Sequence, residues 1–274
     1  MSASPPVIRL NGLSKSFDGK AVLDGLGLSV ARGESLVIVG KSGTGKSVLL
    51  KHVIGLLRPD AGTVEIEGED FWKADRVRRN GIRRKFGMAF QEGALFDSMS
   101  VEENIAFPLV RNTKMSPAEV RARVAECLDL VHLSGLGSKS PAELSGGMRR
   151  RLGFARAIAL SPSILLFDEP TTGLDPITTD VIVGVITALG KRMGPTSITI
   201  THDLKFAFAI ADRVALLHGG RILVSLPPKE FEASSDPHVA AFVRGDASLE
   251  EPEDTGSFRA LAAGPAGPTI GTTP

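Results

Sequence analysis

The sequence has a single cysteine, no tyrosine and one tryptophan among its 274 residues. One cysteine cannot form a disulfide within the chain, and this usage is typical of proteins in a reducing cytosol. Aromatic residues make up only 5% of the chain and the formal net charge is +1. The chain therefore lacks both the basic field and the interleaved aromatic residues of single-strand binders, and we expect no nucleic-acid partner.

Long apolar runs are also missing. The longest, Val181–Leu189, is about half of the ~20 residues that a membrane-spanning helix needs. The first residues, MSASPPVIRL, contain no basic segment followed by an apolar stretch, so no secretory signal is visible. We expect a cytosolic protein whose association with any membrane is peripheral. Cys127 falls in an amphipathic helical pattern and is expected to be a buried small hydrophobe, with a reactive thiol as the alternative.

Short apolar runs alternate with helical patterns, which is typical of an α/β domain with a largely parallel sheet. Strands are predicted at Val7–Leu10, Leu36–Val39, Phe86–Phe90, Ile164–Phe167, Ser197–Thr201 and Val214–Leu217, and helices at Lys46–Leu57, Thr178–Leu189 and Leu204–Ala211. Gly62–Gly68 alternates apolar and polar residues, as a half-exposed antiparallel strand does. Ser116 and Ser140 each begin a Ser-Pro-Ala-Glu capping box, the first of which starts a helix through Leu130.

The composition divides the chain into two parts. Residues 1–244 form the folded domain, with a more helical segment at about 92–160. Residues 245–274 are first acidic and then rich in proline, glycine and small residues. We expect this tail to be disordered in isolation, and docking onto a partner is the alternative.

A phosphate-binding loop is predicted between the strand Leu36–Val39 and the helix that follows it. Gly40-Lys41-Ser42-Gly43-Thr44-Gly45-Lys46-Ser47 matches the pattern G-x-x-x-x-G-K-[ST]. The glycines let backbone N–H groups and the helix N-terminus surround phosphates. Lys46 would reach the β- and γ-phosphates of a nucleotide, and the Ser47 hydroxyl would bind Mg²⁺. Lys41 occupies a variable position, and we expect its side chain to be solvated. The rival interpretation is a glycine-rich turn that binds nothing.

Two acids, Asp168 and Glu169, end the apolar strand Ile164–Phe167. In a nucleotide-binding sheet, ligands lie at the carboxyl ends of the strands. Asp168 would hold the Mg²⁺ ion, and Glu169 would orient and deprotonate the attacking water. A helix-capping acidic pair is the rival interpretation, and the upstream phosphate loop favours the catalytic one.

Between these elements lies Leu144-Ser145-Gly146-Gly147-Met148, followed by the helical run RRRLGFARAIAL. This segment resembles the signature motif of ABC-type ATPases, usually LSGGQ. Other landmarks of the family fall in order: Gln91 resembles the Q-loop glutamine, Gly173-Leu174-Asp175 the D-loop, His202 the H-loop histidine and Phe17 the aromatic residue that stacks on adenine. The resemblance covers about residues 7–230. It implies ATP and Mg²⁺ as cofactors, and a P-loop NTPase fold of ABC type whose mostly parallel core sheet is joined by an antiparallel β subdomain and a helical subdomain.

The resemblance further implies that two copies of the chain pair head-to-tail around two ATP molecules. Ser145 and Gly147 of one copy would then contact the γ-phosphate that the other copy's loop holds, and Asp175 would line the interface between the copies. Met148 replaces the usual signature glutamine and cannot make its hydrogen bonds. Because the phosphate-facing groups are Ser145 and Gly147, we expect activity to survive this replacement.

The remaining family residues are assigned by the same resemblance. His202 would contact the γ-phosphate and help to position water beside the catalytic Lys46 and Glu169. Gln91 would join the metal or the water and report the nucleotide state to the partner subunit. Phe17 would stack on adenine, and a packed core phenylalanine is the rival role.

The resemblance implies that the chain is the ATP-hydrolysing subunit of an ABC transporter. The stretch after Gln91, EGALFDSMSVEENIAFPL, narrows the kind of transporter. Together with Met148 and the continuation Asp175-Pro176-Ile177, this stretch resembles the ATPases of Mce-type lipid transporters, such as the bacterial maintenance-of-lipid-asymmetry (Mla) system. The resemblance implies a multi-spanning permease, a membrane-anchored Mce-type protein and a place on the inner face of the inner membrane. Leu95, Phe96, Met99 and Phe107 would be apolar contacts, some with the permease and some in the core. Packing alone is the rival explanation of these differences.

Two alternatives stay open. The first is an ABC ATPase that serves another solute, against which the stretch after Gln91 speaks. The second is a non-transport ABC ATPase acting on ribosomes or DNA. Such proteins usually carry two cassettes or a long coiled coil, whereas this chain has one intact cassette and no heptad run.

Overall fold

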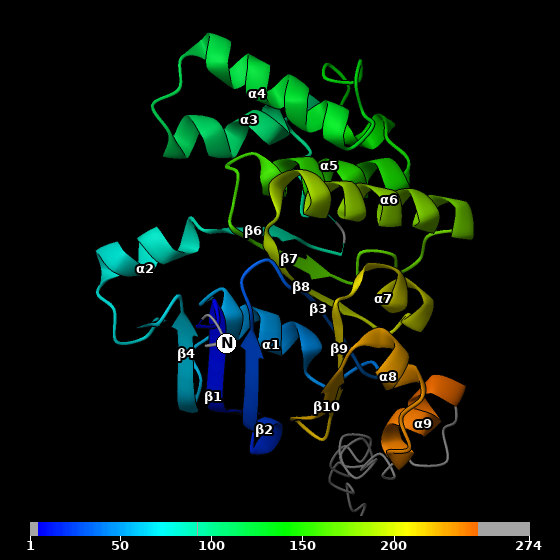
Figure 1. Cartoon of the computed structure of the whole chain (residues 1–274). Helices are drawn as coiled ribbons and strands as arrows, with labels where there is room; N and C mark the ends of the chain where they lie inside the picture. The colour runs from blue at the N-terminus through cyan, green and yellow to red at the C-terminus, as the bar shows by residue number, and fades with distance from the viewer. Residues whose placement is uncertain (1–4, 92, 246–274) are drawn as a thin grey trace, which may run out of the picture.

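The computed structural model describes residues 5–91 and 93–245, and it contains two β-sheets with helices packed between and around them (Figure 1). A four-stranded antiparallel sheet has the order β2-β1-β4-β5, and a six-stranded sheet has the order β10-β9-β3-β8-β7-β6. The strands are β1 (Ile8–Phe17), β2 (Lys20–Val30), β3 (Ser35–Val39), β4 (Ala61–Ile66), β5 (Glu69–Asp70), β6 (Phe86–Ala89), β7 (Ile164–Asp168), β8 (Thr196–Thr201), β9 (Arg213–His218) and β10 (Arg221–Leu226). Within the larger sheet every neighbouring pair is parallel except β9 with β10.

The helices connect and cover these strands. They are α1 (Lys46–Val53), α2 (Arg76–Arg83), α3 (Val101–Asn112), α4 (Pro117–Leu130), the short 3₁₀ helix η1 (Pro141–Glu143), α5 (Gly146–Ile158), α6 (Pro176–Met193), α7 (Leu204–Ile210), α8 (Pro228–Glu232) and α9 (Pro237–Arg244). The predicted α/β fold, with its parallel core sheet, antiparallel sheet and helical segment, is confirmed.

Both faces of the central strands β3, β7 and β8 are buried, and neighbouring residues of each strand point to opposite faces. In β7, Ile164 and Leu166 pack against α1 and the antiparallel sheet, while Leu165 and Phe167 pack against the helical segment. The same alternation in β3 sends Val37 and Val39 toward α7, α8 and α9. Helix α1 is therefore enclosed between the two sheets, which fixes the loop that precedes it.

Helix α1 is shorter than the sequence suggests. The helix predicted through Leu57 ends at Val53, because Gly55 adopts a left-handed conformation with φ of 70°. A Cβ atom on Gly55 would lie 2.1 Å from the ring of Phe71, so the close approach of that ring requires glycine here.

The helical segment begins after β6. Helices α3 and α4 start at complete capping boxes on Ser100 and Ser116, the second as predicted, and both helices lie at the end of the molecule away from the antiparallel sheet (Figure 1). Phe154 of α5 meets Phe167 of β7 with ring centroids 5.3 Å apart. The helical segment thus shares one apolar core with the sheet.

Cys127 is fully buried in this core, as predicted, and burial raises the pKa of its thiol to about 11. Since the thiolate is the reactive form, Cys127 is inert at neutral pH. Of the predicted tail at 245–274, all but Gly245 lies outside the described residues. Among the helices within residues 5–91 and 93–245, none is both long and apolar enough to cross a membrane.

A buried histidine on α1 leads to a pH-dependent stability. The side chain of His52 is fully buried, Nδ1 lies 2.7 Å from the Val48 carbonyl oxygen, and burial lowers the pKa of His52 below its usual value. The unfolded chain protonates this residue below pH ~6.5, whereas the folded chain resists protonation. The free energy of unfolding should therefore fall as the pH drops below ~6.5, by at most about 1.4 kcal/mol per pH unit from this group.

Urea unfolding between pH 7.5 and 5.5 measures this effect. His52→Leu should flatten the pH dependence, because it removes the titrating group from the core. His132→Asn, at an exposed site, should leave the dependence as it is in the parent chain. An equal fall in both variants would contradict the assignment to His52.

Candidate functional site

Four neighbouring strands of the parallel sheet deliver the predicted site residues to one edge. The loop Gly40–Ser47 follows β3, Asp168 and Glu169 end β7, and His202 follows β8, which lies between those two strands. Gln91 follows β6, the neighbour of β7. Parallel strands end at the same edge of a sheet, so this placement follows from the topology alone.

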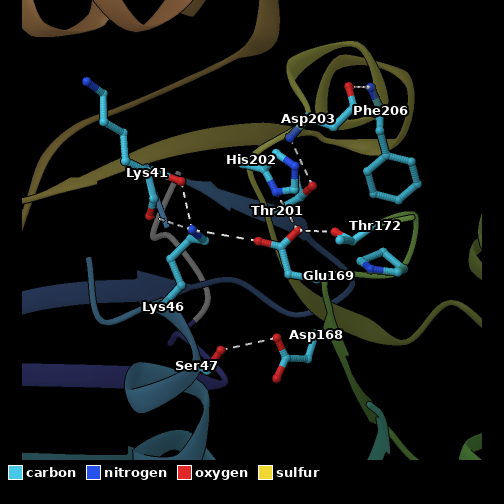
Figure 2. Close-up of polar contacts among 12 residues, drawn as sticks. Lys41, Lys46, Ser47, Asp168, Glu169, Thr172, Thr201, His202, Asp203 and Phe206 are labelled. Carbon is cyan, nitrogen blue, oxygen red and sulfur yellow. Dashed lines mark hydrogen bonds and ion pairs between the residues drawn. The ribbon is translucent and has the colours of Figure 1, made fainter. Parts of the chain in front are cut away.

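The loop closes tightly on its surroundings. A Cβ atom on Gly40 would lie 2.6 Å from the Leu217 carbonyl oxygen, and one on Gly45, at φ of 96°, would lie 2.9 Å from Val22. Neither position can carry a side chain without displacing backbone or core. Ser42 and Gly43 are exposed, and Thr44 donates a hydrogen bond from Oγ1 to the Lys41 carbonyl oxygen at 2.9 Å. The Lys41 side chain is exposed, as predicted, and points away from Glu169 (Figure 2).

Lys46 lies at the centre of the site with only 6% of its side chain exposed. Its Nζ donates hydrogen bonds to the carbonyl oxygens of Gly40 at 2.7 Å and Lys41 at 2.8 Å, and it lies 3.7 Å from Oε1 of Glu169. Burial lowers the pKa of Lys46, and the Glu169 carboxylate counteracts this. A buried ammonium group beside the N-terminus of α1 provides strong positive potential for a phosphate group.

Ser47 and Asp168 form a compact oxygen pair. The Ser47 hydroxyl donates a hydrogen bond to Oδ1 of Asp168 at 3.3 Å (Figure 2). Burial raises the pKa of Asp168, and the hydrogen bond from Ser47 opposes that shift. A hydroxyl and a carboxylate held together in this way fit Mg²⁺, a hard cation that takes oxygen ligands and usually keeps several waters. The described residues include no cluster of three or more acidic, histidine or cysteine ligands.

Glu169 is held from several sides. Its backbone has a left-handed φ of 47°, which is costly for a residue other than glycine. Its Oε2 accepts a hydrogen bond from the Thr172 hydroxyl at 2.9 Å and lies 3.0 Å from Nδ1 of His202. Lys46, Glu169 and His202, which the sequence predicts to be catalytic, are thus brought together (Figure 2). The contact of Thr172 was not predicted, because nothing in its sequence context marks it.

Gln91 and Phe17, two further predicted site residues, are exposed at the ends of strands. Gln91 is exposed beyond the end of β6, and within the described residues no hydrogen bond joins it to Ser47 or Asp168. Phe17 ends β1 and is 42% exposed, with Nζ of Lys15 5.4 Å from its ring centroid. The rival role of Phe17 as a core residue is therefore wrong, because a large part of its side chain is exposed.

The signature segment begins helix α5. Ser145 is the exposed N-cap, and its hydroxyl accepts a hydrogen bond from the Met148 backbone N–H at 3.3 Å. The Met148 side chain packs against the apolar core of the helical segment. Gly147 is buried against α6, where a Cβ atom would lie 2.4 Å from Cγ2 of Thr178.

Asp175 is tied to the same contact. It is the N-cap of α6: one carboxylate oxygen accepts from the Thr178 backbone N–H at 3.0 Å and the other from the Thr178 hydroxyl at 2.6 Å. The D-loop and the signature therefore meet through Thr178 within one chain. In the part of the chain that the structure describes, no hydrogen bond or ion pair links Ser145, Gly147 or Asp175 with Lys46 or the Glu169 side chain.

Known proteins resemble this chain in both sequence and fold. The sequence profile of the family described as "ABC transporter" matches residues 23–172. A probable ribonucleotide transport ATP-binding protein, mkl, from Mycobacterium tuberculosis is 41% identical over 87% of this chain and 66% of its own length. The methionine import ATP-binding protein MetN of Brucella abortus is 42% identical over 81% of this chain and 60% of its own length. The chain thus spans slightly less than two thirds of these relatives.

Two solved structures match over most of their own length. The first is cbiO1 of Clostridium perfringens, part of the ABC transporter complex cbiONQ, with a TM-score of 0.78 and 29% identity over 88% of this chain and 96% of that one. The second is a dimeric ATP-binding cassette in a post-hydrolysis state bound to ADP and Pi, with a TM-score of 0.74 and 31% identity over 81% of this chain and 98% of that one.

Proposed function

We propose that this chain, which belongs to the ABC transporter family of ATP-binding and ATP-hydrolysing subunits, uses the edge of its parallel sheet to hydrolyse ATP and thereby power transport. The observation that carries this proposal is the convergence of Lys46, Ser47, Asp168, Glu169 and His202 from three neighbouring strand ends. The matching solved cassette bound to ADP and Pi supports the same nucleotide chemistry.

Each residue has a physical task in this reaction. Lys46 and the N–H groups at the start of α1 bind the phosphate chain and offset its charge. Ser47 and Asp168 would hold Mg²⁺, which would supply positive charge beside the phosphate oxygens. Glu169 accepts a hydrogen bond from the attacking water and takes its proton, while His202 and Thr172 keep the Glu169 carboxylate oriented. Gln91, as a further ligand of the metal or the water, stays a prediction.

The site needs a second copy of the chain. Ser145 is exposed at the N-terminus of α5, and its hydrogen bonds are local. In a head-to-tail dimer, Ser145 and the N–H groups near Gly147 would close the site of the partner copy, with Asp175 at the interface. The dimeric relatives of known structure support the pairing of two copies. Phe17 would stack on the adenine through the exposed part of its ring.

For the cargo we propose a lipid, moved by an Mce-type (Mla-like) complex with this chain on the inner face of the inner membrane. Its support is the segment after Gln91, which resembles lipid-transport ATPases. Phe96 in this segment is 38% exposed and packs on Phe107, with ring centroids 4.7 Å apart. Asn104 fixes the segment through hydrogen bonds to the backbone of Phe96 and Met99. An exposed phenylalanine backed by a second, half-buried one suits an apolar helix of a multi-spanning permease.

A second candidate is transport of a polar solute. It is favoured by the names of relatives that carry ribonucleotides or methionine. The experiment isolates the complex through a tag on this chain and identifies copurified lipid by mass spectrometry. ATP turnover is then measured with phospholipid, ribonucleotide or methionine added. Stoichiometric phospholipid together with turnover stimulated by phospholipid supports the lipid proposal, whereas stimulation by ribonucleotide or methionine alone supports the second candidate.

A further inference from the structure

Helix α5 carries an arginine that reaches the segment behind the catalytic carboxylate. Nη1 of Arg150 lies 2.9 Å from the carbonyl oxygens of both Pro170 and Thr172, and 3.4 Å from that of Glu169. Three carbonyl groups that are close in sequence thus converge on one guanidinium nitrogen. None of the roles described above uses this contact.

The segment so held is the one that sets the direction of the Glu169 side chain. Glu169 has a left-handed backbone, which an unrestrained chain avoids. Its N–H donates to the Ile200 carbonyl oxygen of β8 at 3.0 Å, which ties the front of the segment to the sheet. Residues 169–172 form a turn after β7, and the Thr172 hydroxyl at the end of this turn orients the Glu169 carboxylate. The carbonyl oxygens of this turn are the ones that Arg150 contacts.

We propose that Arg150 is a positioning residue for the catalytic base Glu169. Through Arg150, the direction of the Glu169 carboxylate depends on the position of helix α5, which the signature segment begins. The inference deepens the proposed function and rests on the role of Glu169 in it. The signature serine, Ser145, and Arg150 belong to the same helix, so the helix that closes one site also holds the base of the site within its own chain.

The chemistry of arginine explains why this position needs it. A guanidinium stays charged even where burial lowers its pKa, as it does for Arg150. Its charge-assisted hydrogen bonds to carbonyl groups are roughly twice as strong as neutral ones. A lysine has a compact ammonium head and cannot match the planar fork, so it should restore the contact only in part.

The neighbouring residue on the helix is a matched control. Nη1 of Arg151 contacts the carbonyl oxygens of Val131 and His132, each at 3.0 Å, at the end of α4. Arg150 and Arg151 are thus both arginines of helix α5, and each contacts backbone carbonyl oxygens through Nη1. Only Arg150 reaches the segment after β7. Methionine at either position keeps much of the apolar stem and removes the charged fork.

The experiment compares Arg150→Met, Arg150→Lys and Arg151→Met in the transporter complex purified through a tag on this full-length chain. The proposal expects kcat for ATP to fall about 10- to 100-fold in Arg150→Met, with KM and ATP affinity within about twofold of the parent. Arg150→Lys should recover part of kcat. Arg150→Met and Arg151→Met should lower the melting temperature of the complex by similar amounts. Arg151→Met should nevertheless leave kcat within about twofold of the parent.

Two results would overturn the proposal: parent-like kcat in Arg150→Met, or equal losses of kcat in Arg150→Met and Arg151→Met. If Arg150→Met does not fold, Arg150→Lys decides, because parent-like kcat in that variant contradicts the need for the fork. Glu169→Gln, measured alongside, separates this test from the proposed function. Loss of turnover in Glu169→Gln with normal turnover in Arg150→Met rejects the role of Arg150 alone, whereas normal turnover in Glu169→Gln rejects the catalytic assignment itself.

Discussion

Glu169→Gln is expected to bind ATP and to hydrolyse it about 10²- to 10⁴-fold more slowly than the parent chain. Glutamine has the shape of glutamate and can still accept a hydrogen bond from the Thr172 hydroxyl, but its amide cannot take a proton from water. The substitution also removes a negative charge 3.7 Å from Nζ of Lys46, which leaves more of the lysine charge for the phosphates. Slow hydrolysis with intact binding should hold two copies together around ATP.

Two measurements test this expectation: steady-state ATP turnover of the complex, and the ATP-dependent dimer fraction of the variant chain by size-exclusion chromatography. Glu126→Gln is a suitable control, since Glu126 is an exposed residue of α4 whose ion pair is with Arg123. Near-parent turnover in Glu169→Gln would show that another group deprotonates the water.

Lys46→Met is expected to lose both ATP binding and turnover, with kcat falling by about 10²- to 10³-fold or more. The substitution removes the buried charge that faces the phosphates, and it leaves the Gly40 and Lys41 carbonyl groups without their shared donor. Because Lys46 is the first residue of α1, the shape of the loop should suffer together with its charge.

Equilibrium binding of ATP and turnover measure the effect, with Lys191→Met on the exposed last turn of α6 as the control. Circular dichroism spectra of both variants test whether the fold survives. Unchanged ATP affinity in folded Lys46→Met would contradict the assignment of the loop as the phosphate site.

The sequence was sufficient to predict which residues lie at the carboxyl edge of the parallel sheet, because local patterns specify this edge. Apolar runs that end in glycine, in two acids or in histidine place their polar residues beyond the strands, and a parallel sheet aligns those ends. The α4 capping box is equally local, since Ser116 and Glu119 lie three residues apart.

The missed features depend on segments that are far apart in the chain. Helix α1 ends early because the ring of Phe71 lies against Gly55. Arg150 reaches the carbonyl oxygens of Pro170 and Thr172, about twenty residues further on. A short sequence window contains at most one partner of such a contact, so only the folded chain reveals the pair.

The contact between Gly147 and Thr178 constrains how the two positions can change over generations. A methyl group at 147 would overlap Cγ2 of Thr178, yet serine at 178 lacks that carbon and keeps the hydroxyl that binds Asp175. Alanine at 147 is therefore tolerable only in a lineage that already has serine at 178, whereas serine at 178 is tolerable by itself. The change from glycine and threonine to alanine and serine at positions 147 and 178 can therefore occur in only one order. The residue present at 178 decides whether a mutation at 147 survives selection.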